Sequence, residues 1–100
     1  MKTTLSINGS TVTVTLSGRF TTDEAAGFLK DIEPLMEERR ADVSMDLAGL
    51  DFISSAGIRC FVMLLKACNA NESTLTLKNL TPQIKDILTL TALIDKFKLE

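Results

Sequence analysis

The amino-acid sequence predicts a single α/β domain, or α+β by some schemes, in which a mixed sheet of four to five strands carries helices mainly on one face. A chain of 100 residues with 45% apolar side chains is long enough for one modest core and too short for two. Some segments alternate apolar and polar residues with a period of two, and others repeat apolar residues at spacings of three and four. The first pattern indicates strands and the second indicates helices.

The first half of the chain is predicted to form a hairpin followed by a helix. Residues 2 to 17 alternate on both sides of Asn8-Gly9, a dipeptide that favours a two-residue hairpin turn. After Ser17-Gly18, either Thr21 or Thr22 can cap a helix whose first turn holds carboxylates at the positive end of the helix dipole. This helix is expected to end at Glu37-Glu38-Arg39-Arg40. Its apolar stripe comprises Ala25, Phe28, Ile32 and Leu35.

The second half is predicted to form a strand–helix–strand unit and a last helix. A third strand alternates through Val43, Met45 and Leu47 and ends in a turn at 48–51, and a helix begins near Ser54 or Ser55. A fourth strand follows around 75–77, and Thr81-Pro82 is a helix start signal. The intervening helix makes the third and fourth strands parallel. Because both strands alternate, helices are expected on mainly one face of the sheet.

Composition excludes several classes of function. Eleven basic against thirteen acidic residues give a net charge of −2, and the aromatic residues are five Phe without Trp or Tyr. Neither the charge nor the stacking surface that nucleic acid requires is present. There is no histidine, so Ser-His and Cys-His catalysis and the commonest metal ligand are absent. We therefore expect a protein that is not an enzyme and needs no metal or cofactor.

The cysteines and the hydropathy pattern indicate the cellular location of the protein. Cys60 and Cys68 lie eight residues apart in one helical segment, too far apart for a disulfide, and are expected to be reduced packing residues. The longest apolar run, 60–65, is too short for a signal peptide or a membrane span. A cytoplasmic location without membrane insertion is expected.

The segment from Asp51 to Arg59, which leads from a strand into a helix, is the most informative part of the sequence. Only one of its two adjacent serines can be the N-cap, so the hydroxyl of the other is left near unpaired helix N–H groups that suit an anion such as a phosphoryl group. In the alternative interpretation, both serines only cap and begin the helix, and Gly57 allows tight packing. Spacing alone does not choose between them.

Residues 46 to 59, Asp-Leu-Ala-Gly-Leu-Asp-Phe-Ile-Ser-Ser-Ala-Gly-Ile-Arg, resemble the signature of the STAS domain family, which contains bacterial anti-sigma-factor antagonists. The resemblance extends over the whole chain, residues 1–100, as a single STAS domain. It includes the opening hairpin, a glycine-containing turn at 17–20 and the late helix that begins with proline. It implies a STAS-like mixed sheet and a role in transcription regulation through protein–protein interaction.

The resemblance also implies a site. In this family a serine at the start of the helix after the third strand is phosphorylated by a partner that is both a serine kinase and an anti-sigma factor, and a phosphatase restores it. Alignment on Gly57 places that serine at Ser55, with Ser54 as the next candidate. The unphosphorylated form binds the anti-sigma factor, and the phosphorylated form releases it. The partner-binding residues implied are Thr21, Phe52, Ile53, Ser54, Ser55, Ala56, Gly57 and Arg59.

Two departures from the family pattern open a second hypothesis. Phosphorylated members commonly carry aspartate just before the serine and another in the turn after the second strand, where this chain has Ser54 and Thr21. The alternative is a STAS subunit that is not phosphorylated and docks on a larger assembly, such as the ATPase of an ABC transporter. An enzyme with Ser54 or Ser55 as nucleophile is disfavoured because the sequence offers no activating base. The chain is expected to be a monomer or a weak dimer.

Overall fold

The structure is a computed structural model that describes residues 1–36 and 41–100. The predicted helix end at 37–40 lies outside the described residues. In chain order the elements are β1 (Lys2–Asn8), β2 (Thr11–Phe20), the 3₁₀ turn η1 (Thr22–Glu24), α1 (Ala25–Met36), β3 (Asp42–Ile53), α2 (Ser55–Ala70), β4 (Leu75–Lys78), α3 (Pro82–Leu90), the 3₁₀ turn η2 (Ile94–Lys96) and β5 (Lys98–Leu99).

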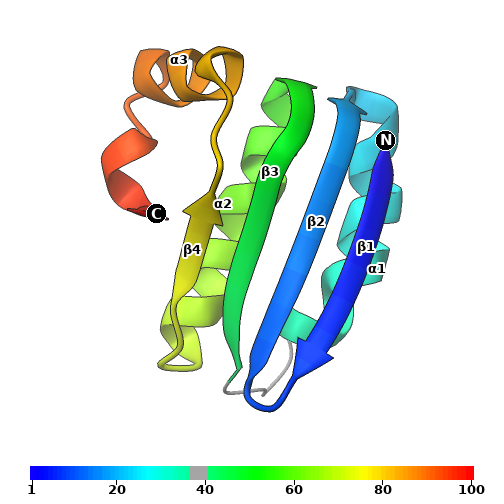
Figure 1. The fold of residues 1–100 in the computed structure, drawn as a ribbon, viewed down its shortest axis with the longest axis vertical. Coiled ribbons are helices and arrows are strands. Elements are labelled where there is room, and N and C mark those ends of the chain that lie inside the picture. Colours follow the sequence, from blue (N-terminus) through cyan, green and yellow to red (C-terminus); the bar gives the residue numbers. More distant parts are fainter. Residues whose placement is uncertain (37–40) are drawn as a thin grey trace.

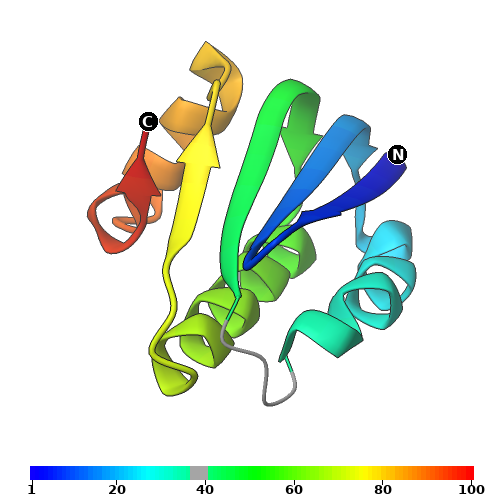
Figure 2. The same ribbon diagram turned by 60° about the horizontal axis from the view of Figure 1, so that its bottom comes forward.

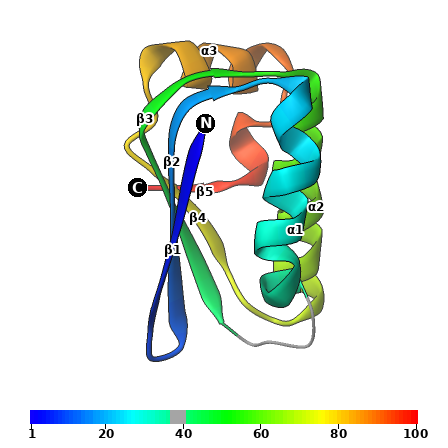
Figure 3. The ribbon, with the colours of Figure 1, turned by 90° about the vertical axis from the view of Figure 1, so that its right-hand side faces the viewer.

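The five strands form one mixed sheet in the order β1-β2-β3-β4-β5 (Figure 1). β1 pairs antiparallel with β2, and every later pair of neighbours is parallel. Helices α1 and α2 lie side by side on one face of the sheet, whereas α3 crosses the end at which β3 finishes (Figures 2 and 3). The predicted mixed sheet with helices mainly on one face is confirmed.

The alternation of residues along the strands separates a buried face from an open face. In β2, Val12, Val14 and Leu16 are almost fully buried under the helices, whereas the intervening threonines reach the open face. Phe20, Phe28 and Phe61 make edge-on or tilted contacts, with ring centroids 5.0 to 6.2 Å apart, in the centre of the buried layer. The period-two pattern therefore records which side of each strand faces the helices.

The opening hairpin turns one residue later than the sequence predicts. Asn8 pairs with Thr11 as the last residue of β1, so the loop is Gly9-Ser10 and not Asn8-Gly9. Gly9 has a φ of +64°, and Ser10 keeps an ordinary negative φ. This combination is typical of a type II′ turn, which needs glycine at its first central position. Gly9 thus lies in the turn, as predicted, but at its first central position and not its second.

Two further turns predicted from glycines are wrong, because both segments continue as strand. β2 runs through 17–20, where Gly18 adopts a φ of +98°, and β3 runs through 48–51 to Ile53. Between these strands the register shifts twice, and each time β3 carries one extra residue. A Cβ on Gly49 would lie 2.8 Å from the Cβ of Ser17. Gly49 therefore permits close strand approach at a bulge.

Of the two threonines predicted to begin helices, Thr81 and Thr21, only Thr81 caps its helix with its side chain. Thr81 accepts a hydrogen bond from the Ile84 N–H at 3.4 Å and donates one to the carbonyl of Leu50 at 3.1 Å, which fixes the start of α3 against β3. Thr21 precedes η1 but makes no side-chain cap bond, and α1 itself begins only at Ala25.

Cys60 and Cys68 are buried and free, as expected.

Asp46 ties the bulged part of β3 to the end of β4. Its Oδ1 accepts hydrogen bonds from the Asn79 side-chain amide and from the Ala48 N–H, both at 3.1 Å. The Asn79 bond first, and the Ala48 bond second, lower the pKa of the Asp46 carboxyl from its ordinary value. Asn79 itself has a φ of +57°, so this contact also holds a left-handed residue where β4 ends.

An Asp46→Asn variant should have a free energy of unfolding lower by about 0.5–1.5 kcal/mol at pH 7, the usual contribution of such hydrogen bonds. Since the folded pKa is depressed, the native contribution is complete above the unfolded pKa and is lost as the pH falls through the folded pKa. The difference from wild type should therefore shrink in acid. Urea unfolding between neutral and acid pH measures it, with exposed Asp86→Asn as the control. An equal difference at every pH would contradict the role of the carboxylate.

Candidate functional site

The junction of β3 and α2 is joined directly to the end of β2. The Ser54 N–H donates to the carbonyl of Phe20 at 2.7 Å, which extends the pairing of Phe20 with Ile53 by one residue. Thr21 follows Phe20, so it lies beside Ser54 at this edge. The carboxyl ends of the parallel strands therefore bring together two segments that are more than thirty residues apart in the sequence (Figure 1).

Ser54 and Ser55 have different roles. Ser54 is the N-cap, with φ −78° and ψ 168°, and its Oγ accepts a hydrogen bond from the Gly57 N–H at 3.1 Å. Ser55 is the first residue of α2 and is exposed, whereas Ser54 is partly buried. The structure thus shows which serine is the N-cap: Ser54 holds the helix end, and Ser55 begins the helix and faces solvent. This arrangement is compatible with both interpretations of the two serines.

The N-terminus of α2 is electrostatically positive at Ser55. The first bond within the helix runs from the Ile58 N–H to the Ser54 carbonyl, so the N–H groups of Ser55 and Ala56 have no acceptor inside the helix. These N–H groups and the helix dipole favour negative charge at this point. Arg59, exposed and one helical turn further on, adds a cation on the Ser55 side of the helix.

Gly57 allows α2 to sit close to the sheet. A Cβ at this position would lie 2.7 Å from Cγ1 of Ile53 and 2.8 Å from Cδ1 of Phe20, and both of these side chains are buried. Of the predicted partner-binding residues, Ile53 and Gly57 therefore support the site from below. The side chains that reach the surface, partly or fully, are Thr21, Phe52, Ser54, Ser55, Ala56 and Arg59.

Arg19 belongs to this region, although sequence reasoning did not select it. It pairs with Phe52 across β2 and β3, and its guanidinium carbon lies 4.6 Å from the centre of the Phe52 ring. Arg19 is exposed and Phe52 is partly exposed. No local pattern could have predicted this contact, because it depends on a register that is shifted by two bulges.

Within residues 1–36 and 41–100, no three His, Cys, Asp or Glu side chains are arranged to hold a metal ion. Burial raises the pKa of both cysteine thiols, which disfavours the reactive thiolate. Over the same residues, no helix is long and apolar enough to cross a membrane.

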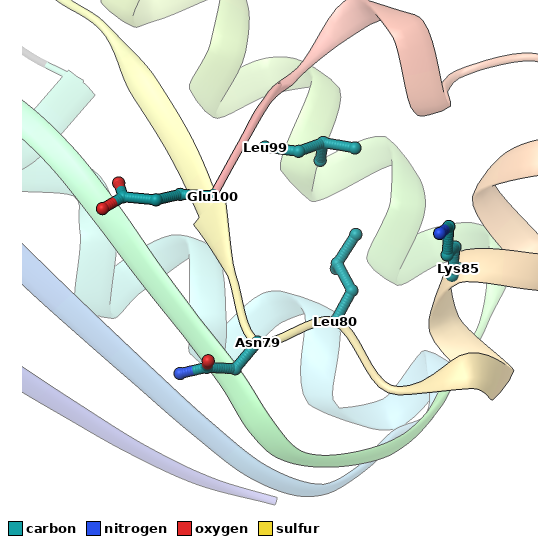
Figure 4. Close-up of a pocket in the computed structure, with 5 residues that line it drawn as sticks. All are labelled: Asn79, Leu80, Lys85, Leu99 and Glu100. Atoms are coloured by element: carbon teal, nitrogen blue, oxygen red, sulfur yellow. The ribbon is translucent and has the colours of Figure 1, made fainter.

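A shallow pocket of about 370 Å³ lies near the end of the chain, beside α3 and β5 (Figure 4). Leu80, Leu99 and Lys85 face its space, and Asn79 and Glu100 carry their polar ends toward β3. None of these residues belongs to the predicted partner-binding set. The pocket and the Ser55 surface are therefore different features of the molecule.

A model of the family described as "Mlab, STAS domain" matches residues 3–99. The chain belongs to the STAS domain family. No curated protein matches the sequence.

Solved structures confirm the fold at low sequence identity. An anti-sigma-factor antagonist (STAS) domain protein from Planctomyces limnophilus has a TM-score of 0.86 at 16% identity, covering 98% of this chain and 87% of that one. An anti-sigma factor antagonist from Mycobacterium paratuberculosis has a TM-score of 0.84 at 17% identity, with 98% and 83% covered. The Bacillus cell fate determinant SpoIIAA in its phosphorylated form has a TM-score of 0.78 at 15% identity, with 99% and 91% covered.

The two serines should respond differently to replacement by alanine. Ser54→Ala removes the N-cap and should lower the free energy of unfolding by about 1 kcal/mol. Ser55→Ala should change it by less than about 0.5 kcal/mol, because alanine suits a helix and the Ser55 hydroxyl does not form the cap. Urea unfolding of both variants measures this, and a larger loss for Ser55→Ala would contradict the assignment.

Gly57→Ala should lower the free energy of unfolding by about 1–3 kcal/mol, because the new methyl group overpacks against Ile53 and Phe20. Gly27→Ala, in α1, is the matched control. A Cβ there meets nothing within 4 Å, so this variant should gain up to about 1 kcal/mol from helix propensity. Thermal and urea unfolding of the pair give the comparison. Equal effects at both positions would rule out close packing as the reason for Gly57.

Proposed function

We propose that this domain is an anti-sigma-factor antagonist that binds an anti-sigma factor with serine kinase activity through the loop and helix that begin at Ser54-Ser55. Reversible phosphorylation of Ser55 switches this binding, and a phosphatase restores the free hydroxyl. The observation that carries the proposal is that the two serines differ in role at this helix end. Ser54 forms the cap, and Ser55 is the exposed first residue of α2. Structures named as anti-sigma factor antagonists share the fold.

The binding surface in this proposal is small and preorganised. Phe52 offers a partly exposed ring, held by the Arg19 guanidinium 4.6 Å from its centre, beside Ser55 and Ala56 at the start of α2. Arg59 extends the surface by one turn. Because Gly57 and the Ser54 N–H fix α2 on the ends of β2 and β3, these groups are held in place before the partner arrives.

Phosphorylation of Ser55 would act on binding and not on folding. A phosphoserine adds roughly −1.5 to −2 charges, and this charge is favourable at a helix N-terminus with free N–H groups. Arg59 is within one turn and suits a phosphate. The same charged and hydrated group opposes a partner surface that fits a neutral hydroxyl, since its water must be removed there. The partner is therefore released while the domain stays folded.

In this proposal the domain has no catalytic chemistry of its own and acts in the cytoplasm on transcription. The kinase and the phosphatase supply the phosphoryl chemistry, and this chain supplies the acceptor. The absence of histidine from the sequence supports this assignment, since neither serine has that base to activate it.

A second candidate function is a STAS subunit that docks permanently on a larger assembly, such as the ATPase of an ABC transporter, without phosphorylation. The observation in its favour is that neither Ser54 nor Thr21 carries a carboxylate. Ser54 forms the N-cap, and Thr21 lies next to it; phosphorylated family members commonly have aspartate at both positions. The same surface would then serve as a constant docking site.

The intact mass of the protein purified from its own cells separates the two candidates. One added phosphate that is lost in Ser55→Ala would support the switch and locate it. A phosphate that remains in Ser55→Ala would move it, with Ser54→Ala as the next variant. Absence of phosphate in every growth condition would contradict the switch and favour the docking subunit.

Partner binding supplies the second test. A tagged Ser55→Asp variant, used as bait in lysate of the same cells, should retain at least about tenfold less of the partner captured by wild type, because the carboxylate places charge in the interface. Ser55→Ala is the matched control and should retain the partner. Equal capture by Ser55→Asp would count against a charge-operated switch. Co-purification of all three baits with one membrane-associated complex would support permanent docking.

A further inference from the structure

β1 is an edge strand that lacks the features by which proteins normally prevent pairing with another strand. Its seven residues, Lys2–Asn8, pair with β2 in a register without a shift, and no proline or bulge interrupts them. The only charge in the strand is on Lys2, at its start. Proteins normally block such an edge with charges, proline or a bulge. Among residues 1–36 and 41–100, no strand pairs with the outer side of β1 (Figure 1), whereas the opposite edge strand, β5, has only two residues.

The edge also exposes apolar side chains. Leu5 is 40% exposed and Ile7 is 57% exposed. They pair with Val14 and Val12, which are almost fully buried on the helix side, so Leu5 and Ile7 point toward that same face. The apolar layer of the sheet therefore continues onto β1 and is only partly covered there.

The hairpin determines which backbone groups point outward. In a hairpin with a two-residue loop, the residues that flank the loop, here Asn8 and Thr11, form a hydrogen-bonded pair. Hydrogen-bonded and non-hydrogen-bonded pairs alternate along an antiparallel ladder. Thr3, Leu5 and Ile7 consequently direct their N–H and C=O groups away from β2. The same three residues carry side chains on the helix side.

We propose that β1 is a self-association edge, at which a second copy of this chain pairs antiparallel, β1 against β1, on a two-fold axis through Leu5. Leu5 then faces Leu5 of the second copy, and Thr3 faces Ile7. The two strands would exchange about six ladder hydrogen bonds, which satisfy every outward N–H and C=O of these residues. The register is self-complementary, as a closed two-fold interface requires.

Charge agrees with this register. Lys2 faces Asn8 of the second copy, and the other opposing pair, Thr4 with Ser6, is uncharged, so no like charges meet. The joined sheet would contain about ten strands, within the range of open sheets. A single pair of strands with two apolar residues on each side is a narrow interface, so the dimer should be weak and reversible. This inference does not depend on the proposed function.

Symmetric cross-linking tests the register. Opposite residues of a hydrogen-bonded antiparallel pair have Cα atoms about 5.5 Å apart, within the range of a disulfide. Leu5→Cys should therefore form a covalent dimer under mild oxidation, because the native cysteines are buried. Asn8→Cys is the control, since its two copies would lie about 20 Å apart. Equal cross-linking of both variants, or stronger cross-linking of Ser6→Cys, would overturn the axis through Leu5.

Sedimentation of the unmodified chain from about 10 μM to 1 mM tests the dimer itself. Wild type should shift toward dimer with concentration, and the double variant Leu5→Lys/Ile7→Lys should weaken the dimer at least about tenfold by placing charges on the edge. The matched control is Met63→Lys/Leu90→Lys, which changes exposed apolar residues of α2 and α3. Circular dichroism establishes that each variant is folded. A wild type that stays monomeric at 1 mM, or a control that dissociates equally, would refute the proposal.

Discussion

The close approach of the α2 N-terminus to the ends of β2 and β3 is the constraint on which the site depends. The Ser54 N–H bonds the Phe20 carbonyl at 2.7 Å, and the absence of a side chain at Gly57 lets the first turn of α2 rest on Ile53 and Phe20. Any residue with a Cβ at 57 would push the helix away from the strand ends. The cap at Ser54, the exposure of Ser55 and the position of Arg59 all follow from this contact.

The same contact explains why the site can be both rigid and accessible. Three buried residues fix this contact: Phe20, Ile53 and Gly57. The exposed side chains above them are therefore not needed to hold α2 on the sheet. Ser54 is the exception, because its hydroxyl closes the helix end. A phosphoryl group on Ser55 would meet free N–H groups and a helix dipole of favourable sign, and the domain beneath it would not have to change.

A sheet covered by helices on one face also determines what the edges can do. The apolar layer that packs under α1 and α2 reaches β1 through Leu5 and Ile7, which are only partly covered. β1 is long and regular, whereas β5 is short, so the two edges of the sheet are not equivalent. A second copy paired with β1 on a two-fold axis would satisfy the outward backbone groups of this edge and would also extend the apolar layer.

The sequence by itself determined the order of elements from β1 to α3 and the mixed sheet, and it placed the start of α2 near Ser54 or Ser55, because period-two and period-three-to-four patterns and capping residues act locally. The STAS signature also pointed to Ser55. The sequence could not distinguish a glycine that makes a turn from one that permits a bulge, so the turns predicted at Gly18 and Gly49 were wrong. Only the tertiary structure decided that β2 and β3 run on, that Ser54 is the cap and that Arg19 lies over Phe52. These features depend on strand register and close packing between distant segments, which no local pattern records.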